Sequence, residues 1–131
     1  MNVQDLMNLP HKEGIKIDDW QVVHPNLRIL AYELIEYCKS RNLPLVITSL
    51  IRPKIPGVSK TDIHAKARAF DLSVKDWTID DCLLCEKYFN QNYDKIGAIS
   101  QETGLPRACL YENPMYNHRG TGGHLHFQVK P

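Results

Sequence analysis

The chain has 131 residues, which fits one domain with one core, and its 43% hydrophobic and 24% charged residues are ordinary for a globular protein. Its 16 lysines and arginines nearly balance 15 aspartates and glutamates, so a net charge of +1 excludes a strong overall attraction to nucleic acid or to an anionic membrane. No apolar run is long enough to span a bilayer, and residues 1–5 lack the basic start of a secretory signal. From the chain length we expect a single domain over residues 1–131.

The first predicted element is an amphipathic helix over residues 25–42. Apolar side chains recur there at the i, i+3, i+4, i+7 spacing of a helix with one buried face. Pro25 suits the first turn, while Lys39 and Arg41 suit the negative C-terminal end. Pro44 prevents the helix from continuing.

The later elements indicate the fold class. In chain order they are strands at 45–50 and 69–74, a helix from Thr78 to about Asn90, short strands at 96–100 and 108–112, a loop at 113–123 and a last strand at 124–129. The second helix begins at a capping-box pattern, Thr78 with Asp81 three residues later. Because strands cluster late with short connections, we expect an α+β domain with a mainly antiparallel sheet and helices packed on one face.

Polar side chains interrupt two of these strands on a single face. Since the apolar positions of 69–74 and 124–129 must face the helices, Asp71, His124 and His126 project from the opposite face. If the two strands are neighbours, Asp71 and His126 converge, and His64 can fold back over them from the preceding loop. Two imidazoles and a carboxylate match a catalytic zinc site with one open position for water. The alternative is an ordinary H-x-H pair, half-exposed on a strand.

Three short motifs follow one another in the chain: 49-SLIR-52, 62-DIHAKARAFD-71 and 124-HLH-126. Together they resemble the zinc peptidases of bacterial cell walls, whose pattern is S-x-x-R, then S-x-H-x-x-G-x-A-x-D, then a late H-x-H. That group contains D-Ala-D-Ala carboxypeptidases and L-alanyl-D-glutamate endopeptidases, including phage endolysins. It belongs to the LAS superfamily, with lysostaphin and Hedgehog domains. The resemblance implies a LAS/Hedgehog-like fold with a zinc cleft on the sheet face opposite the helices.

The resemblance also implies roles for individual residues. The Zn²⁺ ligands would be His64, Asp71 and His126, and His124 would carry a proton or stabilise the transition state. Arg52 would bind a peptide carbonyl or carboxylate, a task that suits the planar fork of a guanidinium. The alternative for Arg52 is a solvated side chain at a strand end.

The match departs from the family pattern at two positions. Asp62 replaces the usual serine, and Ala67 replaces the usual glycine. From Ala67 we expect that this backbone position does not require a positive φ. Some relatives carry a catalytic glutamate three residues before the last histidine ligand, where Gly123 stands here, so a mechanism based on His124 is expected. His118 is expected to be a surface residue, with a place in the substrate groove as the alternative, and the sequence leaves open whether Tyr111 and Glu112 border the cleft.

These inferences predict a zinc metallopeptidase that hydrolyses peptide bonds in peptidoglycan stem peptides. We expect a monomer with no nucleic-acid partner and no membrane insertion. It would be made in the cytoplasm without a signal peptide and would reach the cell wall as a phage lytic enzyme, through a holin or as part of the virion. A non-catalytic zinc-binding domain of the same fold is the first alternative. A redox protein using Cys82 and Cys85 is the second, and buried thiols packing a helix face are the simplest interpretation of that pair.

Overall fold

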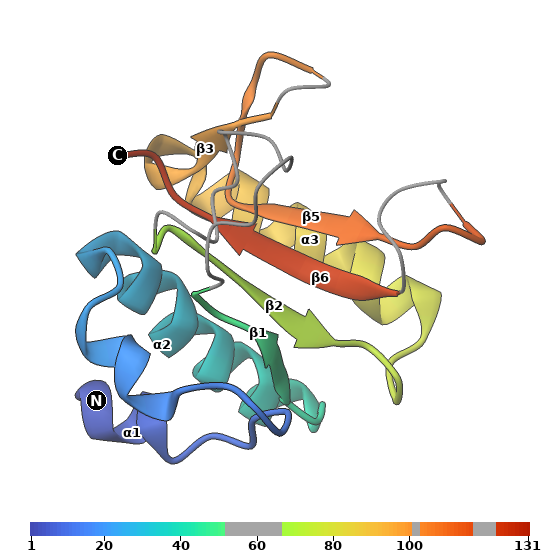
Figure 1. Ribbon diagram of the computed structural model, residues 1–131. Coiled ribbons are helices and arrows are strands. Elements are labelled where there is room, and N and C mark those ends of the chain that lie inside the picture. Colours follow the sequence, from blue (N-terminus) through green and yellow to red (C-terminus); the bar gives the residue numbers. More distant parts are fainter. Residues whose placement is uncertain (52–66, 101–102, 117–122) are drawn as a thin grey trace.

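The computed structural model describes residues 1–51, 67–100, 103–116 and 123–131, and its centre is a four-stranded sheet (Figure 1). The strands are β1 (Ile47–Ser49), β2 (Ala69–Ser73), β5 (Cys109–Glu112) and β6 (His124–Gln128). They lie in the order β1-β2-β6-β5, and every neighbouring pair is antiparallel. The predicted α+β class with an antiparallel sheet is therefore confirmed.

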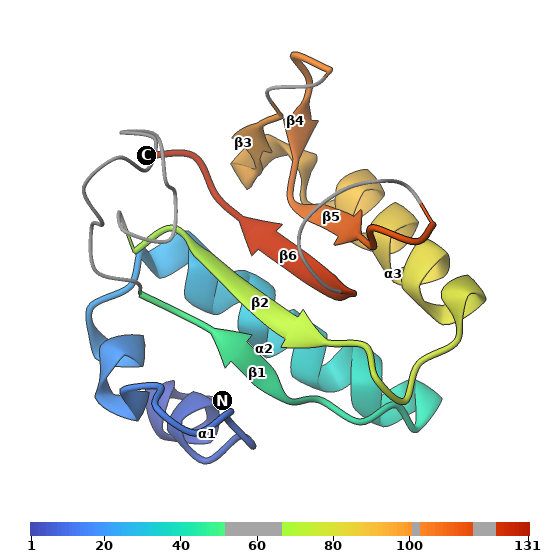
Figure 2. The same ribbon diagram turned by 45° about the vertical axis from the view of Figure 1, so that its right-hand side comes forward.

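Two long helices, α2 (Pro25–Arg41) and α3 (Ile79–Asn92), cover one face of this sheet (Figure 2). Both were predicted, and their ends follow from local chemistry. Helix α2 stops at Asn42, which takes the left-handed conformation with φ of 54°. Helix α3 starts at the predicted capping box, in which the Asp81 amide donates to Thr78 Oγ1 at 3.0 Å and the Thr78 amide donates to Asp81 Oδ2 at 3.0 Å.

Three short helical elements were not predicted: α1 (Val3–Met7), η1 (Ile17–Gln21) and η2 (Asp94–Ile96). None is long enough to show a helical periodicity in the sequence. Leu6 of α1 and Trp20 of η1 are nevertheless fully buried in the core. Within the described residues, no helix is both long and apolar enough to cross a membrane.

The core lies between the helices and the sheet. Phe70 of β2 stacks on Phe127 of β6 with ring centroids 4.9 Å apart, and Phe89 of α3 meets Phe127 edge-on at 5.1 Å. Leu72 and Leu125 are also fully buried there. These residues are the apolar positions of the two strands, so the predicted division of faces is confirmed. The polar positions of β2 and β6 are thereby turned away from the helices.

The predicted strand at 96–100 is much shorter than expected. Only β3 (Ala98–Ile99) forms, and it pairs with β4 (Pro106–Arg107) as a separate two-stranded sheet. Four strands rather than three therefore follow α3 in the part of the chain that the structure describes. The absence of a side chain at Gly97 allows the close packing here, because a Cβ at that position would lie 2.6 Å from the backbone nitrogen of Ala108. A bridge between Gly97 and Val129 joins this hairpin to the end of β6.

The expectation for Ala67 is wrong. Ala67 has φ of 58°, so the position does adopt the left-handed conformation that glycine takes without steric strain. The carbonyl of Ala67 accepts a hydrogen bond of 2.9 Å from the His24 amide, at the start of α2. That tertiary contact, together with the entry into β2 two residues later, holds the alanine in a conformation its own preference disfavours.

Candidate functional site

Asp71 and His126 form the centre of the candidate site. Strands β2 and β6 are paired so that Asp71 lies directly opposite His126. His126 Nδ1 is 2.9 Å from Asp71 Oδ1, and the two residues are only 7% and 8% exposed. The convergence predicted from the alternation of strand faces is therefore confirmed.

His124 lies on the same face, nearer to solvent. Its Nε2 is 3.6 Å from Glu112 Oε1 and 3.9 Å from Asp71 Oδ2. Its side chain is 20% exposed, compared with 9% for His126. The more exposed ring is thus positioned to meet a bound molecule, and the more buried ring is held against Asp71.

Glu112 is a second carboxylate at this site. It stands directly opposite His124 in the pairing of β5 with β6. Interaction with His124 lowers the pKa of Glu112, burial opposes that change, and the charges of His126 and His124 lower the pKa further. Glu112 therefore stays ionised beside His124 at neutral pH.

Tyr111 does not border the site. It is buried in the core among residues that face the helices, because it alternates with Glu112 along β5. Its hydroxyl accepts a hydrogen bond of 2.8 Å from Asn113 Nδ2. Of the two residues that the sequence left open, Glu112 faces the polar side and Tyr111 faces the core.

Arg52, Asp62, His64 and His118 lie outside the described residues. The described chain reaches Ile51 just after β1, whose Ser49 pairs with Asp71. It resumes at Ala67, two residues before β2. The predicted roles of Arg52 and His64 stay predictions.

Two of the three predicted metal ligands are thus brought together. Within residues 1–51, 67–100, 103–116 and 123–131, no three His, Cys, Asp or Glu side chains form a group that could hold a metal ion. The chemistry of the pair nevertheless fits zinc, which binds imidazole nitrogen and carboxylate oxygen. Two such donors, each roughly 2.0–2.1 Å from a tetrahedral ion, lie about 3.3 Å apart. The 2.9 Å between His126 Nδ1 and Asp71 Oδ1 is a hydrogen-bond distance and is shorter than that separation, so the two atoms would move slightly apart around an ion.

From the sequence, Gln128 shares the polar face of the last strand with both histidines, but no role was predicted for it. It is the third polar residue on this face of β6, it is buried, and its Oε1 lies 3.0 Å from His126 Nε2. The period-2 alternation that singled out His124 and His126 also places Gln128 beside them.

The cysteines are part of the core. Cys38, Cys82, Cys85 and Cys109 are all buried and free. Burial raises the pKa of Cys82 to about 12 and that of Cys38 to about 12, so both stay protonated at neutral pH. Cys82 and Cys85 therefore pack the inner face of α3, and a low-pKa redox thiol is not found at Cys82.

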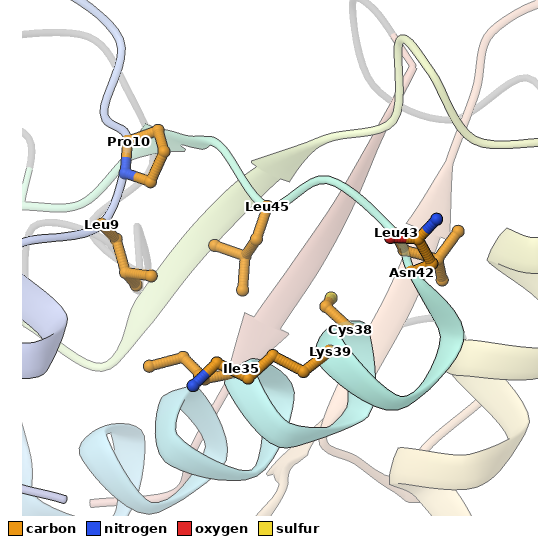
Figure 3. A pocket seen from close by; sticks show the side chains of 8 residues that line it. All are labelled: Leu9, Pro10, Ile35, Cys38, Lys39, Asn42, Leu43 and Leu45. Atoms are coloured by element: carbon orange, nitrogen blue, oxygen red, sulfur yellow. The ribbon is translucent and has the colours of Figure 1, made fainter.

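A hollow of about 390 Å³ lies beside the C-terminal half of α2 (Figure 3). Leu9, Ile35 and Leu45 point into it from three separate segments, with Lys39 along one side. None of the site residues lines it. Besides apolar contact, its walls offer the amine of Lys39, the amide of Asn42 and the thiol of Cys38, whose pKa burial raises to about 12.

No family model, no curated protein and no solved structure matches this chain. The functional interpretation therefore depends on the motifs and on the geometry around Asp71 and His126.

Proposed function

We propose that this protein is a zinc-dependent peptidase that hydrolyses peptide bonds of bacterial peptidoglycan stem peptides, as a D-Ala-D-Ala carboxypeptidase or an L-Ala-D-Glu endopeptidase. The observation that carries the proposal is the pairing of Asp71 with His126 across adjacent strands, with His124 beside them on the same face. The proposed Zn²⁺ ligands are His64, Asp71 and His126. The sheet with both long helices on one face is compatible with a LAS/Hedgehog-like fold, whose zinc cleft would lie on the other face.

Burial supports a functional interpretation of the pair. A carboxylate and an imidazole removed from water lose hydration, and a fold keeps such groups only where they have a strong partner. Asp71 and His126 have each other, on strands whose neighbouring positions are fully buried apolar residues. If the pair only stabilised the sheet, two apolar residues of similar volume would do so equally well.

When bound, zinc would polarise the scissile carbonyl and activate water for attack. His124 would act on protons, because its Nε2 is close to Asp71 and its ring is the more exposed of the two. A positive charge on His124 would be stabilised by Glu112 and Asp71, both within 3.9 Å of its Nε2. His124 could therefore hold a proton and pass it to the departing amine. Arg52 would bind a carbonyl or carboxylate of the peptide.

The proposed biological setting comes from the resemblance of the three motifs. Enzymes of this kind include phage endolysins, so we propose that the protein is a phage lytic enzyme that acts on the cell wall after release through a holin or as a virion component. The balanced net charge of +1 offers no competing reason to expect a nucleic-acid substrate.

The proposal is tested with purified protein, added zinc and purified peptidoglycan. Metal analysis should give about one zinc per chain, and His126→Ala should abolish binding. Newly released amino groups should appear with wild type and fall by a factor of 10²–10⁴ in His124→Ala while zinc stays bound, because general acid–base catalysis contributes roughly that much. Mass spectrometry of the digest would identify the bond cleaved.

A matched control replaces a histidine outside the site. His24 caps α2 by accepting the Asn26 amide at 3.1 Å, and asparagine can do the same, so His24→Asn should keep both zinc and activity. Full zinc binding with no peptidoglycan hydrolysis by wild type would favour the non-catalytic binding domain. Full activity of His124→Ala would show that its proposed role is wrong.

A further inference from the structure

Gln128 is a buried polar side chain that the proposed mechanism does not use. It is 6% exposed and lies on the same face of β6 as His126. Its Nε2 donates to the carbonyl of Arg107 at 3.0 Å and to that of Ala98 at 3.4 Å. Its Oε1 lies 3.0 Å from His126 Nε2. The amide group is therefore surrounded by partners on both sides.

These partners decide which way the amide points. Backbone carbonyls only accept hydrogen bonds, so the NH₂ group of Gln128 must face Arg107 and Ala98. The reverse orientation would place an amide oxygen against two carbonyl oxygens. Because Ala98 belongs to β3 and Arg107 to β4, the small hairpin holds the amide in place.

The orientation of the amide in turn decides where His126 carries its proton. Gln128 Oε1 can only accept, so His126 Nε2 must be the N–H donor at 3.0 Å. In the neutral ring this leaves the lone pair on Nδ1, the nitrogen that is 2.9 Å from Asp71 Oδ1. Two electron-rich atoms at this distance repel each other unless a proton or a metal cation lies with them.

We infer that Gln128 is a positioning residue that fixes His126 in its Nε2–H form, so that Nδ1 is presented together with Asp71 as a cation ligand. The proton on Nε2 follows from the hydrogen bond to Gln128 Oε1, whereas a proton-free Nδ1 beside Asp71, and its role as a ligand, rest on the proposed function. A residue that holds the far nitrogen of a metal-binding histidine orients the ring and increases its basicity. The β3–β4 hairpin thereby becomes a support for the site.

The experiment compares two substitutions at Gln128. Gln128→Met keeps the approximate size but removes the acceptor for His126 Nε2. Gln128→Glu keeps that acceptor but sets a carboxylate oxygen against the carbonyls of Ala98 and Arg107. If Gln128 sets the tautomer, the Nε2–H form will persist in the variant that keeps the acceptor and will be lost in the variant that lacks it, whatever the stability of each. A merely structural role would affect stability in both variants and leave the tautomer alone.

Two readouts are needed. Nitrogen-15 NMR correlations of the imidazole, recorded at a pH where His126 is neutral, report which ring nitrogen carries the proton. We expect Nε2–H in wild type and Gln128→Glu, and a mixture of both forms in Gln128→Met. Zinc affinity, measured by competition with a chelator, should fall about 10–100-fold in Gln128→Met.

The outcomes separate this inference from the proposed function. A proton on Nδ1 of neutral wild-type His126 would overturn it, as would an unchanged tautomer in Gln128→Met. If wild type binds no zinc but the NMR result holds, the metal-site proposal fails while the positioning role of Gln128 stands. If Gln128→Met does not fold, loss of the Nε2–H form in the shorter Gln128→Asn serves as the same test, and its retention there would count against the inference.

Discussion

Gly97→Ala should destabilise the protein and weaken the candidate site from a distance. A Cβ at position 97 would lie 2.6 Å from the Ala108 nitrogen and 2.7 Å from the Arg107 carbonyl carbon. Both contacts are with backbone, so β3 and β4 must move apart. Overpacking of this kind costs about 1–3 kcal/mol. The φ of −69° at Gly97 is compatible with alanine, so backbone strain adds nothing to that cost.

A shift of β3 and β4 should reach the candidate site through Gln128. The carbonyls that accept hydrogen bonds from its amide belong to Ala98 and Arg107. These two residues pair with each other across the hairpin, next to Gly97. Thermal unfolding should show a Tm lower by about 4–12 °C, at roughly 4 °C per kcal/mol for a chain of this size. Zinc affinity should fall in the same variant, by less than in Gln128→Met.

Gly123→Ala is the matched control. An added Cβ there meets Val74 Cγ2 at 3.5 Å, an ordinary van der Waals contact, although Gly123 directly precedes His124. Its Tm should stay within about 2 °C of wild type, since substitutions without a steric conflict change stability by about 0.5 kcal/mol or less. Equal Tm values for wild type and Gly97→Ala would show that the hairpin does not pack as closely as described, and the reasoning would be refuted.

Three further predictions concern single residues. Ala67→Gly should raise the free energy of unfolding by about 1 kcal/mol in urea, because it relieves a left-handed alanine with φ of 58°; a loss of stability would contradict the strain. Burial lowers the pKa of His11 below 6.5, against the opposing effect of its hydrogen bond with the Leu9 carbonyl, so the unfolded chain binds the proton more readily. The contribution of His11 to stability should thus be complete above pH 6.5 and decline as the pH falls below it. Urea unfolding at several pH values should show a weaker dependence of stability on pH in His11→Gln than in wild type. Glu112→Gln should lower peptidoglycan hydrolysis about 10–100-fold with zinc retained, since it removes the charge beside His124; an unchanged rate would exclude Glu112 from the mechanism.

The sequence by itself determined the elements whose signals are local. Helix α3 could be predicted from Thr78 and Asp81 because a capping box acts within one turn, and the faces of β2 and β6 followed because side chains alternate at every residue. Those rules were enough to place Asp71, His124 and His126 on one polar face. The short helices and strand β4 escaped prediction because a few residues carry no periodicity.

Only the tertiary structure decided which strands are neighbours, and therefore that Asp71 stands opposite His126 and Glu112 opposite His124. Strand pairing joins residues far apart in the chain, so its register depends on how all faces pack together. The same holds for Ala67, whose backbone is held by contacts outside its own segment, and for Gln128, whose amide is oriented by carbonyls of a distant hairpin. Local sequence rules draw attention to these residues, but long-range packing decides which partners they contact.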